Sequence, residues 1–194
     1  MAQTTEKAFE SYVESILLNK AGWQAGTVEE WDEARALFPA QITAFLKDAQ
    51  PKLWMEMEKL HGAGLPEMLV NALAKELDLK GSLHVLRHGF KFYGKTFRLA
   101  YFKPAHGLNP EVLALFARNR LTVTRQVRCH PGKNDTVDMV LALYGLPVAT
   151  CELKNPGTHQ TWRNAIKQYK ENRDPSAPLF KFKEALALGR LLTE

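Results

Sequence analysis

The chain has 194 residues, of which 45% are hydrophobic and 24% are charged, a composition typical of one globular domain with a sizeable core. No apolar run approaches the roughly 18 residues needed to span a membrane, and the N-terminus lacks the pattern of a secretory signal. The two cysteines, Cys129 and Cys151, have no metal-binding spacing. These features argue against a membrane protein or a disulfide scaffold, and we expect a cytoplasmic protein.

Charge is divided unevenly along the chain. Residues 1–80 carry 8 Lys or Arg against 13 Asp or Glu, whereas residues 81–194 carry 18 against 8. A basic surface attracts polyanions such as DNA, although a generic basic face is about as common in domains of this size. DNA is favoured because the basic part also holds the acidic residues described below.

Apolar spacing, caps and prolines predict a mainly helical, acidic N-terminal part, which Gly81 closes. A first helix is predicted to begin at Thr4 or Thr5. Further helices are predicted over residues 29–37, 39–49 and 66–77, and Pro51 is expected to stop the helix at 39–49. Strands and helices then alternate. Strands are predicted over residues 83–86, 90–93, 96–102 and 121–128, and helices from Asn109-Pro110 to about Asn119 and over 161–172; prolines separate the last from residues 180–192. We expect one α/β domain whose residues 81–194 hold the sheet.

The segment from Asp138 to Lys154 is the most informative. Two short apolar runs flank the turn residues Gly145-Leu146-Pro147, which predicts a β-hairpin. Asp138 and Glu152 are equidistant from Gly145, so a hairpin folded about that glycine sets them opposite each other, with Cβ atoms about 4.5–5.5 Å apart. Because side chains alternate along a strand, Lys154 points the same way as Glu152.

Two carboxylates and an ammonium among hydrophobic residues are costly unless a cation joins them. Mg²⁺ takes one or two carboxylates and keeps several waters. An ion held by Asp138 and Glu152 can activate a water that attacks a phosphate, while Lys154 holds that water or stabilises the developing charge. The alternative is a solvent-facing strand with an ordinary Glu/Lys pair, because the pattern is short and degenerate.

The chain also resembles the N-terminal nuclease domain of the type I restriction enzyme R subunit. The resemblance is carried by residues 138–157, 165–169 and 172–175, and by residues 5–10, 83–89, 99–104, 108–110 and 121–128. It therefore covers essentially the whole chain. It implies a restriction-endonuclease-like α/β fold of the PD-(D/E)xK type, with a mixed central sheet flanked by helices, that cuts double-stranded DNA with Mg²⁺.

The resemblance adds Gln168 to the catalytic candidates Asp138, Glu152 and Lys154. It matches the glutamine of the family's Gln-x-x-x-Tyr signature, which lies on the helix after the Glu-x-Lys strand. Here the residue four positions later is Asn172, and the tyrosine is the adjacent Tyr169. Tyr169 is therefore either a functional residue or a half-buried helix residue.

Further residues are candidates for contact with DNA or metal. The DNA-binding candidates are Arg125, Arg128, Lys167, Tyr169 and Arg173. Arg125 and Arg128 either contact phosphate or pair with core acids. Glu6 and Glu10 either supply the extra helix carboxylate that related nucleases direct at the metal or are solvated helix charges. His130 and His159 flank the site in sequence, and each is most simply a surface or hydrogen-bonded residue.

The resemblance implies partners outside this sequence. In a full R subunit a helicase-like motor follows the nuclease domain, and methyltransferase and specificity subunits complete the complex. The chain has no Walker loop, so ATP is expected only in the full-length subunit, and we expect a fragment that ends where the motor begins. Two other functions stay open: a stand-alone repair or structure-selective nuclease, and a non-catalytic module that docks DNA or partner subunits.

Overall fold

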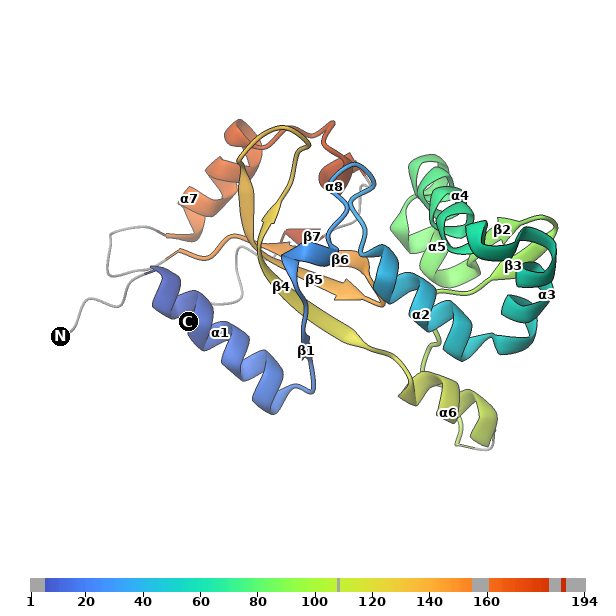
Figure 1. Cartoon of the computed structure of the whole chain (residues 1–194). Coiled ribbons are helices and arrows are strands. Elements are labelled where there is room, and N and C mark those ends of the chain that lie inside the picture. The colour runs from blue at the N-terminus through green and yellow to red at the C-terminus, as the bar shows by residue number, and fades with distance from the viewer. Residues whose placement is uncertain (1–5, 108, 155–160, 182–185, 188–194) are drawn as a thin grey trace.

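A central five-stranded mixed sheet organises the molecule (Figure 1). The computed structural model describes residues 6–107, 109–154, 161–181 and 186–187. The strand order is β1-β4-β5-β6-β7, with β1 at Gln24–Ala25, β4 at Leu121–Arg128, β5 at Thr136–Leu143, β6 at Leu146–Cys151 and β7 at Leu186–Ala187. β4, β5 and β6 are antiparallel, whereas the two-residue strands β1 and β7 pair in parallel with β4 and β6. Within the described ranges no helix is long and apolar enough to cross a membrane.

Helices lie on both sides of this sheet. They are α1 (Glu6–Lys20), α2 (Pro39–Ala49), α3 (Pro51–His61), α4 (Leu65–Lys80), α5 (Ser82–His88), α6 (Pro110–Ala117), α7 (Trp162–Lys167) and α8 (Pro178–Lys181). Short 3₁₀ turns cover Val28–Glu30 and Gly62–Gly64, a π-helical turn, η4, covers Gln168–Asn172, and β2 (Phe90–Phe92) and β3 (Lys95–Phe97) form a separate hairpin. Figure 1 shows α2 to α5 and this hairpin grouped at one side of the molecule, with α1 and α7 at the other.

Two apolar clusters explain why the central strands are buried on both faces. α1 contributes Val13, which packs with Met139 of β5 and Cys151 of β6. The larger cluster joins residues of α2 to α5 to the other side of the sheet, including Val140. Cys151 is one of these core residues, as its apolar surroundings predict.

The hairpin of β5 and β6 forms as predicted, but its turn lies earlier than predicted. Leu143 pairs with Leu146, so Tyr144 and Gly145 are the turn, and Leu146 is already in β6. Both turn residues have positive φ, 50° and 85°, as type I′ hairpin turns require. A Cβ at Gly145 would lie 2.5 Å from the carbonyl oxygen of Phe38, so only glycine fits where the turn meets α2.

A β-bulge restores the predicted pairing further along the hairpin. Ala142 pairs with Pro147, but Leu141 pairs with Ala149, which leaves Val148 as an extra residue in β6. The shifted register continues to Met139 and Cys151. One step further along, Asp138 and Glu152 are opposite each other.

The N-terminal part differs from prediction around residues 29–37, which do not form a helix. Only Val28–Glu30 is a 3₁₀ turn, and Asp32 then pairs with Leu37 as a β-bridge. The consecutive residues Ala36, Leu37 and Phe38 are all fully buried, which a helix covering one face of a core does not allow. The two-residue strand β1 also lies in this part, which is otherwise mainly helical as predicted.

The helix at 39–49 ends before Pro51 as predicted, but Pro51 also starts α3, a helix that was not predicted, because proline suits the first turn of a helix, whose N–H groups have no helical partner. One further prediction was wrong. The predicted strand at residues 83–86 is α5, whose ends lie at Gly81 and Gly89, both with positive φ. The helix at 39–49 and the strand at 121–128 are confirmed, while most of residues 180–192 lies outside the described residues.

Candidate active site

The structure brings the three predicted residues of the hairpin together. Asp138 is half-buried on β5, and Glu152 and Lys154 follow the last residue of β6. Oδ2 of Asp138 accepts a hydrogen bond of 2.6 Å from the backbone N–H of Leu153, whose side chain is buried in the cluster under α1. Since side chains alternate along an extended chain, those of Glu152 and Lys154 point to the side opposite that of Leu153. We call Asp138, Glu152 and Lys154 the acid cluster.

Glu152 is held in an environment that disfavours its charge. Glu152 is 3% exposed, and this burial raises the pKa of its carboxyl group to about 7. The Arg173 guanidinium opposes this increase in pKa, the negative charge of Asp138 adds to it, and Lys154 opposes it weakly. A carboxyl group in this state is only partly ionised near neutral pH, and a nearby cation would favour its ionised form.

Arg173 is an internal partner of Glu152. Nη2 of Arg173 donates a hydrogen bond to Oε1 of Glu152 and another, at 2.6 Å, to the carbonyl oxygen of Thr136. Only 7% of the Arg173 side chain is exposed. In this structure the guanidinium is therefore buried against the acid cluster and bound to Glu152, and the contact of Arg173 with DNA stays a prediction.

The donor chemistry of the acid cluster fits Mg²⁺. Asp138 and Glu152 offer hard carboxylate oxygens, and Mg²⁺ binds through one or two carboxylates with waters completing its shell. Among the described residues there is no group of three or more His, Cys, Asp or Glu arranged to hold a metal. A structural zinc site, which takes four protein ligands, does not fit the described residues.

Helix α1 does not supply a third carboxylate from Glu10. Glu10 is buried and accepts hydrogen bonds from Arg125 at 3.0 and 3.3 Å and from Gln126 at 3.1 Å. Arg125 also binds Glu14 at 3.2 Å. Of the two interpretations of Arg125, pairing with acids is the one the structure has. The side chain of Glu6 lies outside the described residues.

Gln126, which the sequence does not single out, has φ of 52° within β4. It lies between the pairs Arg125–Met139 and Val127–Val137, a position opposite Asp138. Positive φ is uncommon for glutamine, and such conformations are enriched near functional sites. Its side chain is bound to Glu10 of α1 and accepts a hydrogen bond from Thr136. No glycine or asparagine marks the position, so the sequence carries no signal for it.

Gln168 and Tyr169 lie in the π-helical turn after α7. Gln168 is half-buried there. The hydroxyl of Tyr169 is 2.9 Å from Oγ1 of Thr150, and its ring packs edge-on against Phe180. Burial raises the pKa of Tyr169, so its hydroxyl stays protonated. Tyr169 therefore lies half-buried against Phe180 and Thr150, as the alternative interpretation expects, and a functional role for it stays a prediction.

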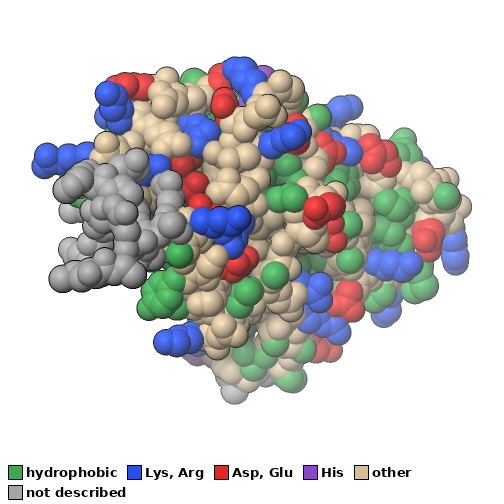
Figure 2. All heavy atoms as spheres, turned by 60° about the vertical axis from the view of Figure 1, so that its left-hand side comes forward, with side chains coloured by type: hydrophobic (Ala, Val, Ile, Leu, Met, Phe, Trp, Pro, Cys, Tyr) green, Lys and Arg blue, Asp and Glu red, His purple; other side chains and the backbone are tan. Residues whose placement is uncertain are grey.

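Two further candidates, Lys167 and Arg128, are at the surface. Lys167 is exposed on α7, 3.7 Å from Glu171, and Arg128 is exposed and binds Glu33 at 3.3 Å. His159 lies outside the described residues. Figure 2, in which this side of the molecule comes forward, shows Lys and Arg side chains spread over the face with Asp and Glu side chains among them. Of the proposed DNA contacts, Lys167 and Arg128 are both exposed, which suits that role.

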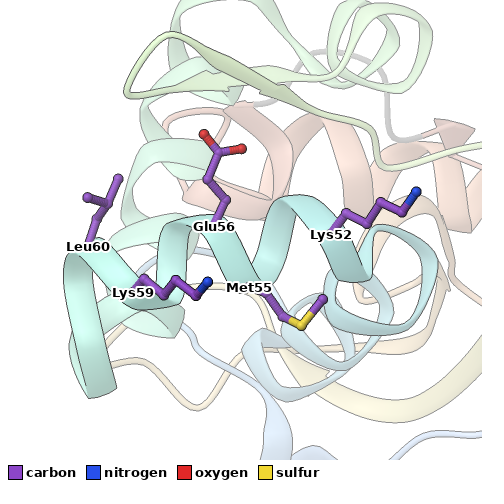
Figure 3. Close-up of a pocket in the computed structure, with 5 residues that line it drawn as sticks. All are labelled: Lys52, Met55, Glu56, Lys59 and Leu60. Carbon is purple, nitrogen blue, oxygen red and sulfur yellow. The ribbon is translucent and has the colours of Figure 1, made fainter.

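A separate depression of about 530 Å³ lies on α3, lined by Lys52, Met55, Glu56, Lys59 and Leu60 (Figure 3). Figure 1 places α3 at the opposite side of the molecule from α7. None of the three acid-cluster residues lines this depression, so it is not part of the candidate active site.

Comparison with known proteins identifies the family. The family described as "Type I restriction enzyme R protein N terminus" matches residues 3–189. No curated protein and no solved structure matches the chain. The family match includes the whole acid cluster, α7 and η4. The chain therefore belongs to the family of the N-terminal domain of type I restriction enzyme R proteins.

Proposed function

We propose that this chain is a PD-(D/E)xK nuclease domain that hydrolyses phosphodiester bonds of double-stranded DNA with Mg²⁺. The observation that carries the proposal is the acid cluster at the open end of the β5–β6 hairpin, in a chain of a restriction enzyme family. The basic balance of residues 81–194 supports a polyanionic substrate. In the whole enzyme, a motor that uses ATP and the methyltransferase and specificity subunits would deliver and select the DNA.

Each residue of the acid cluster has a distinct task in this proposal. Asp138 and Glu152 would hold the ion, which when bound supplies a Lewis acid and an activated water. Lys154 would orient that water or stabilise the negative charge that develops on the phosphate. Asp138 also fixes the backbone at Leu153, so it positions Glu152 and Lys154 as well as contributing charge.

Plasmid cleavage by the R subunit with its partner subunits tests the proposal. Asp138→Ala, Glu152→Ala and Lys154→Ala should each abolish cleavage while circular dichroism shows an intact fold. Glu56→Ala and Lys59→Ala are matched controls, because both residues are exposed on α3. They should cut at the wild-type rate. Wild-type cleavage by Asp138→Ala or by Glu152→Ala would overturn the assignment.

A further inference from the structure

We propose that Arg173 is a positioning residue of the acid cluster, which holds Glu152 by Oε1 so that the other oxygen, Oε2, is presented to the metal ion. This inference rests on the proposed function. It assigns to Arg173 a task toward the metal ligand, with no direct contact to DNA or to the reacting atoms.

The guanidinium of Arg173 is fixed from several directions. Nη2 binds both Glu152 and the carbonyl oxygen of Thr136, and Nη1 lies 3.6 Å from Sγ of Cys129. Thr136 begins β5 two residues before Asp138. Arg173 therefore links the strand that carries Asp138 to the residue that follows β6, and the two carboxylates are held relative to each other.

These anchors make Arg173 a fixed donor. Its bonds to Thr136 and Cys129 do not depend on Glu152, so the guanidinium has a defined place whatever the state of that carboxylate. Arginine suits this task because its planar group presents several donors in fixed directions. A lysine would keep the charge but lose the simultaneous contacts.

The backbone on both sides of Arg173 is also held. Arg173 leaves the π-helical turn in extended conformation, with φ of −99° and ψ of 132°. Asp174, the next residue, accepts hydrogen bonds from the N–H and hydroxyl of Ser176 at 2.8 and 2.6 Å and lies 3.6 Å from His130. π-Helical turns are rare and frequently found at functional sites. Here the turn ends where the guanidinium must reach the acid cluster.

Charge explains why a positioned cation is needed. The Glu152 side chain is 1% exposed, and Asp138 opposite it carries the same charge. Without Arg173, repulsion from Asp138 would favour rotation of the buried Glu152 side chain, and its carboxylate would no longer be held in place as a ligand. Residues that orient metal ligands typically contribute 10–100-fold to metal affinity.

The test is calorimetric titration of Mg²⁺ and Mn²⁺ into the wild-type protein and four variants, Arg173→Gln, Arg173→Lys, Arg35→Gln and Asp138→Ala, so that the measurement does not depend on cleavage. Arg173→Gln should weaken metal affinity by about 10–100-fold, and Arg173→Lys should recover part of the loss. Arg35→Gln is the matched control, because Arg35 is also a partly buried arginine bound to two acids, Asp32 and Glu67. It should bind metal as the wild type does.

Wild-type affinity in folded Arg173→Gln would overturn the inference and leave Arg173 with a structural role. Tighter binding would also overturn it, since Arg173 would then compete with the ion. If Arg173→Gln does not fold, Arg173→Lys decides: affinity equal to that of the wild type overturns the inference, and weaker affinity supports it. If the wild type itself binds no metal while Asp138→Ala still cuts DNA, the proposed function has failed. If Asp138→Ala loses metal affinity while Arg173→Gln keeps that of the wild type, only the inference about Arg173 has failed.

Discussion

The carboxylate of Asp138 holds the backbone of Leu153, through a hydrogen bond of 2.6 Å from the Leu153 N–H to Oδ2. Leu153 lies between Glu152 and Lys154 and is itself 2% exposed on the side of the sheet that α1 covers. One residue of β5 therefore contributes a charge to the acid cluster and sets the direction of its two other members. Removing the charge and removing the hydrogen bond are separable changes.

Asp138→Asn and Asp138→Ala should separate these two tasks. Asparagine can still accept the bond from Leu153 and relieves the repulsion of Glu152, so Asp138→Asn should match or exceed the wild-type stability in the absence of metal. Asp138→Ala loses the bond and should be less stable than Asp138→Asn by about 1 kcal/mol. Urea unfolding in EDTA measures both. Equal stability of the two variants would show that the bond to Leu153 contributes nothing.

Glu152→Gln should change how stability depends on pH. The ordinary pKa of 4.5 applies when the protein is unfolded, and burial raises the pKa to about 7 in the folded protein, so the folded state binds the proton more tightly. This contribution is fully present below about pH 4.5 and is lost as pH rises to about 7. At pH 8 without metal, Glu152→Gln should therefore exceed the wild type by roughly 2–3 kcal/mol. The measurement is urea unfolding from pH 4.5 to 8, and a constant difference between the two proteins would contradict the prediction.

Mg²⁺ binding should release a proton below pH 7. Metal ligands must be deprotonated, and Glu152 with a pKa of about 7 is mostly protonated at pH 6. We expect affinity to increase by about fivefold from pH 6 to 7 and by about tenfold from pH 6 to 8, where it levels off. Calorimetry at pH 6 in two buffers of different ionisation enthalpy counts the protons released. An affinity independent of pH would mean that Glu152 is not a ligand.

Gly145→Ala should be far more costly than Gly94→Ala. Both glycines have positive φ, 85° and 77°, so alanine is strained by about 1 kcal/mol at either position. A Cβ at Gly145 would meet the Phe38 carbonyl at 2.5 Å, whereas a Cβ at Gly94 would have no contact within 4 Å among the residues that the structure describes. We expect a loss of about 2–4 kcal/mol for Gly145→Ala and about 1 kcal/mol for Gly94→Ala in urea unfolding. Similar losses would show that the turn can move away from α2.

Lys167→Ala should affect DNA binding, whereas Arg125→Ala should affect the stability of the fold. Lys167 is exposed, so its loss should change stability by less than about 0.5 kcal/mol but reduce the salt dependence of DNA binding by about one ion. Arg125 pairs with Glu10 and Glu14, and its loss leaves the buried Glu10 without its main partner, which should cost about 2 kcal/mol. Fluorescence anisotropy with duplex DNA at several salt concentrations, together with thermal melts, measures both. An unchanged salt slope in Lys167→Ala would remove α7 from the DNA-binding surface.

The pairing of Asp138 with Glu152 could be predicted from the sequence, but two errors cancelled in doing so. Symmetry about Gly145 gives this pair, whereas the real turn is centred between Tyr144 and Gly145 and would by itself set Asp138 opposite Cys151. The extra residue Val148 restores the predicted pair. A turn with positive φ at tyrosine and a bulge at valine both depend on packing, which local sequence preferences do not reveal.

Partners distant in sequence account for the other differences. Arg125 and Arg173 carry the charge expected of DNA-binding residues, and only the fold shows that they bind Glu10 and Glu152. The sequence distance is 115 residues in the first case and 21 in the second, so neither pair leaves a local pattern. Strand β4, by contrast, was predicted with its observed bounds, because its apolar alternation and β-branched residues are local signals.

The extra residue at Val148 gives the two strands of the hairpin unequal tolerance to changes in length. Loss of Val148 would leave Leu141 opposite Ala149 and Asp138 opposite Glu152, since the bulge alone would disappear. Loss of a residue from β5 between Met139 and Leu143 would instead move Asp138 past its partner. This hairpin can therefore lose one residue of β6 and keep both carboxylates together, whereas the spacing from Asp138 to the turn must stay fixed.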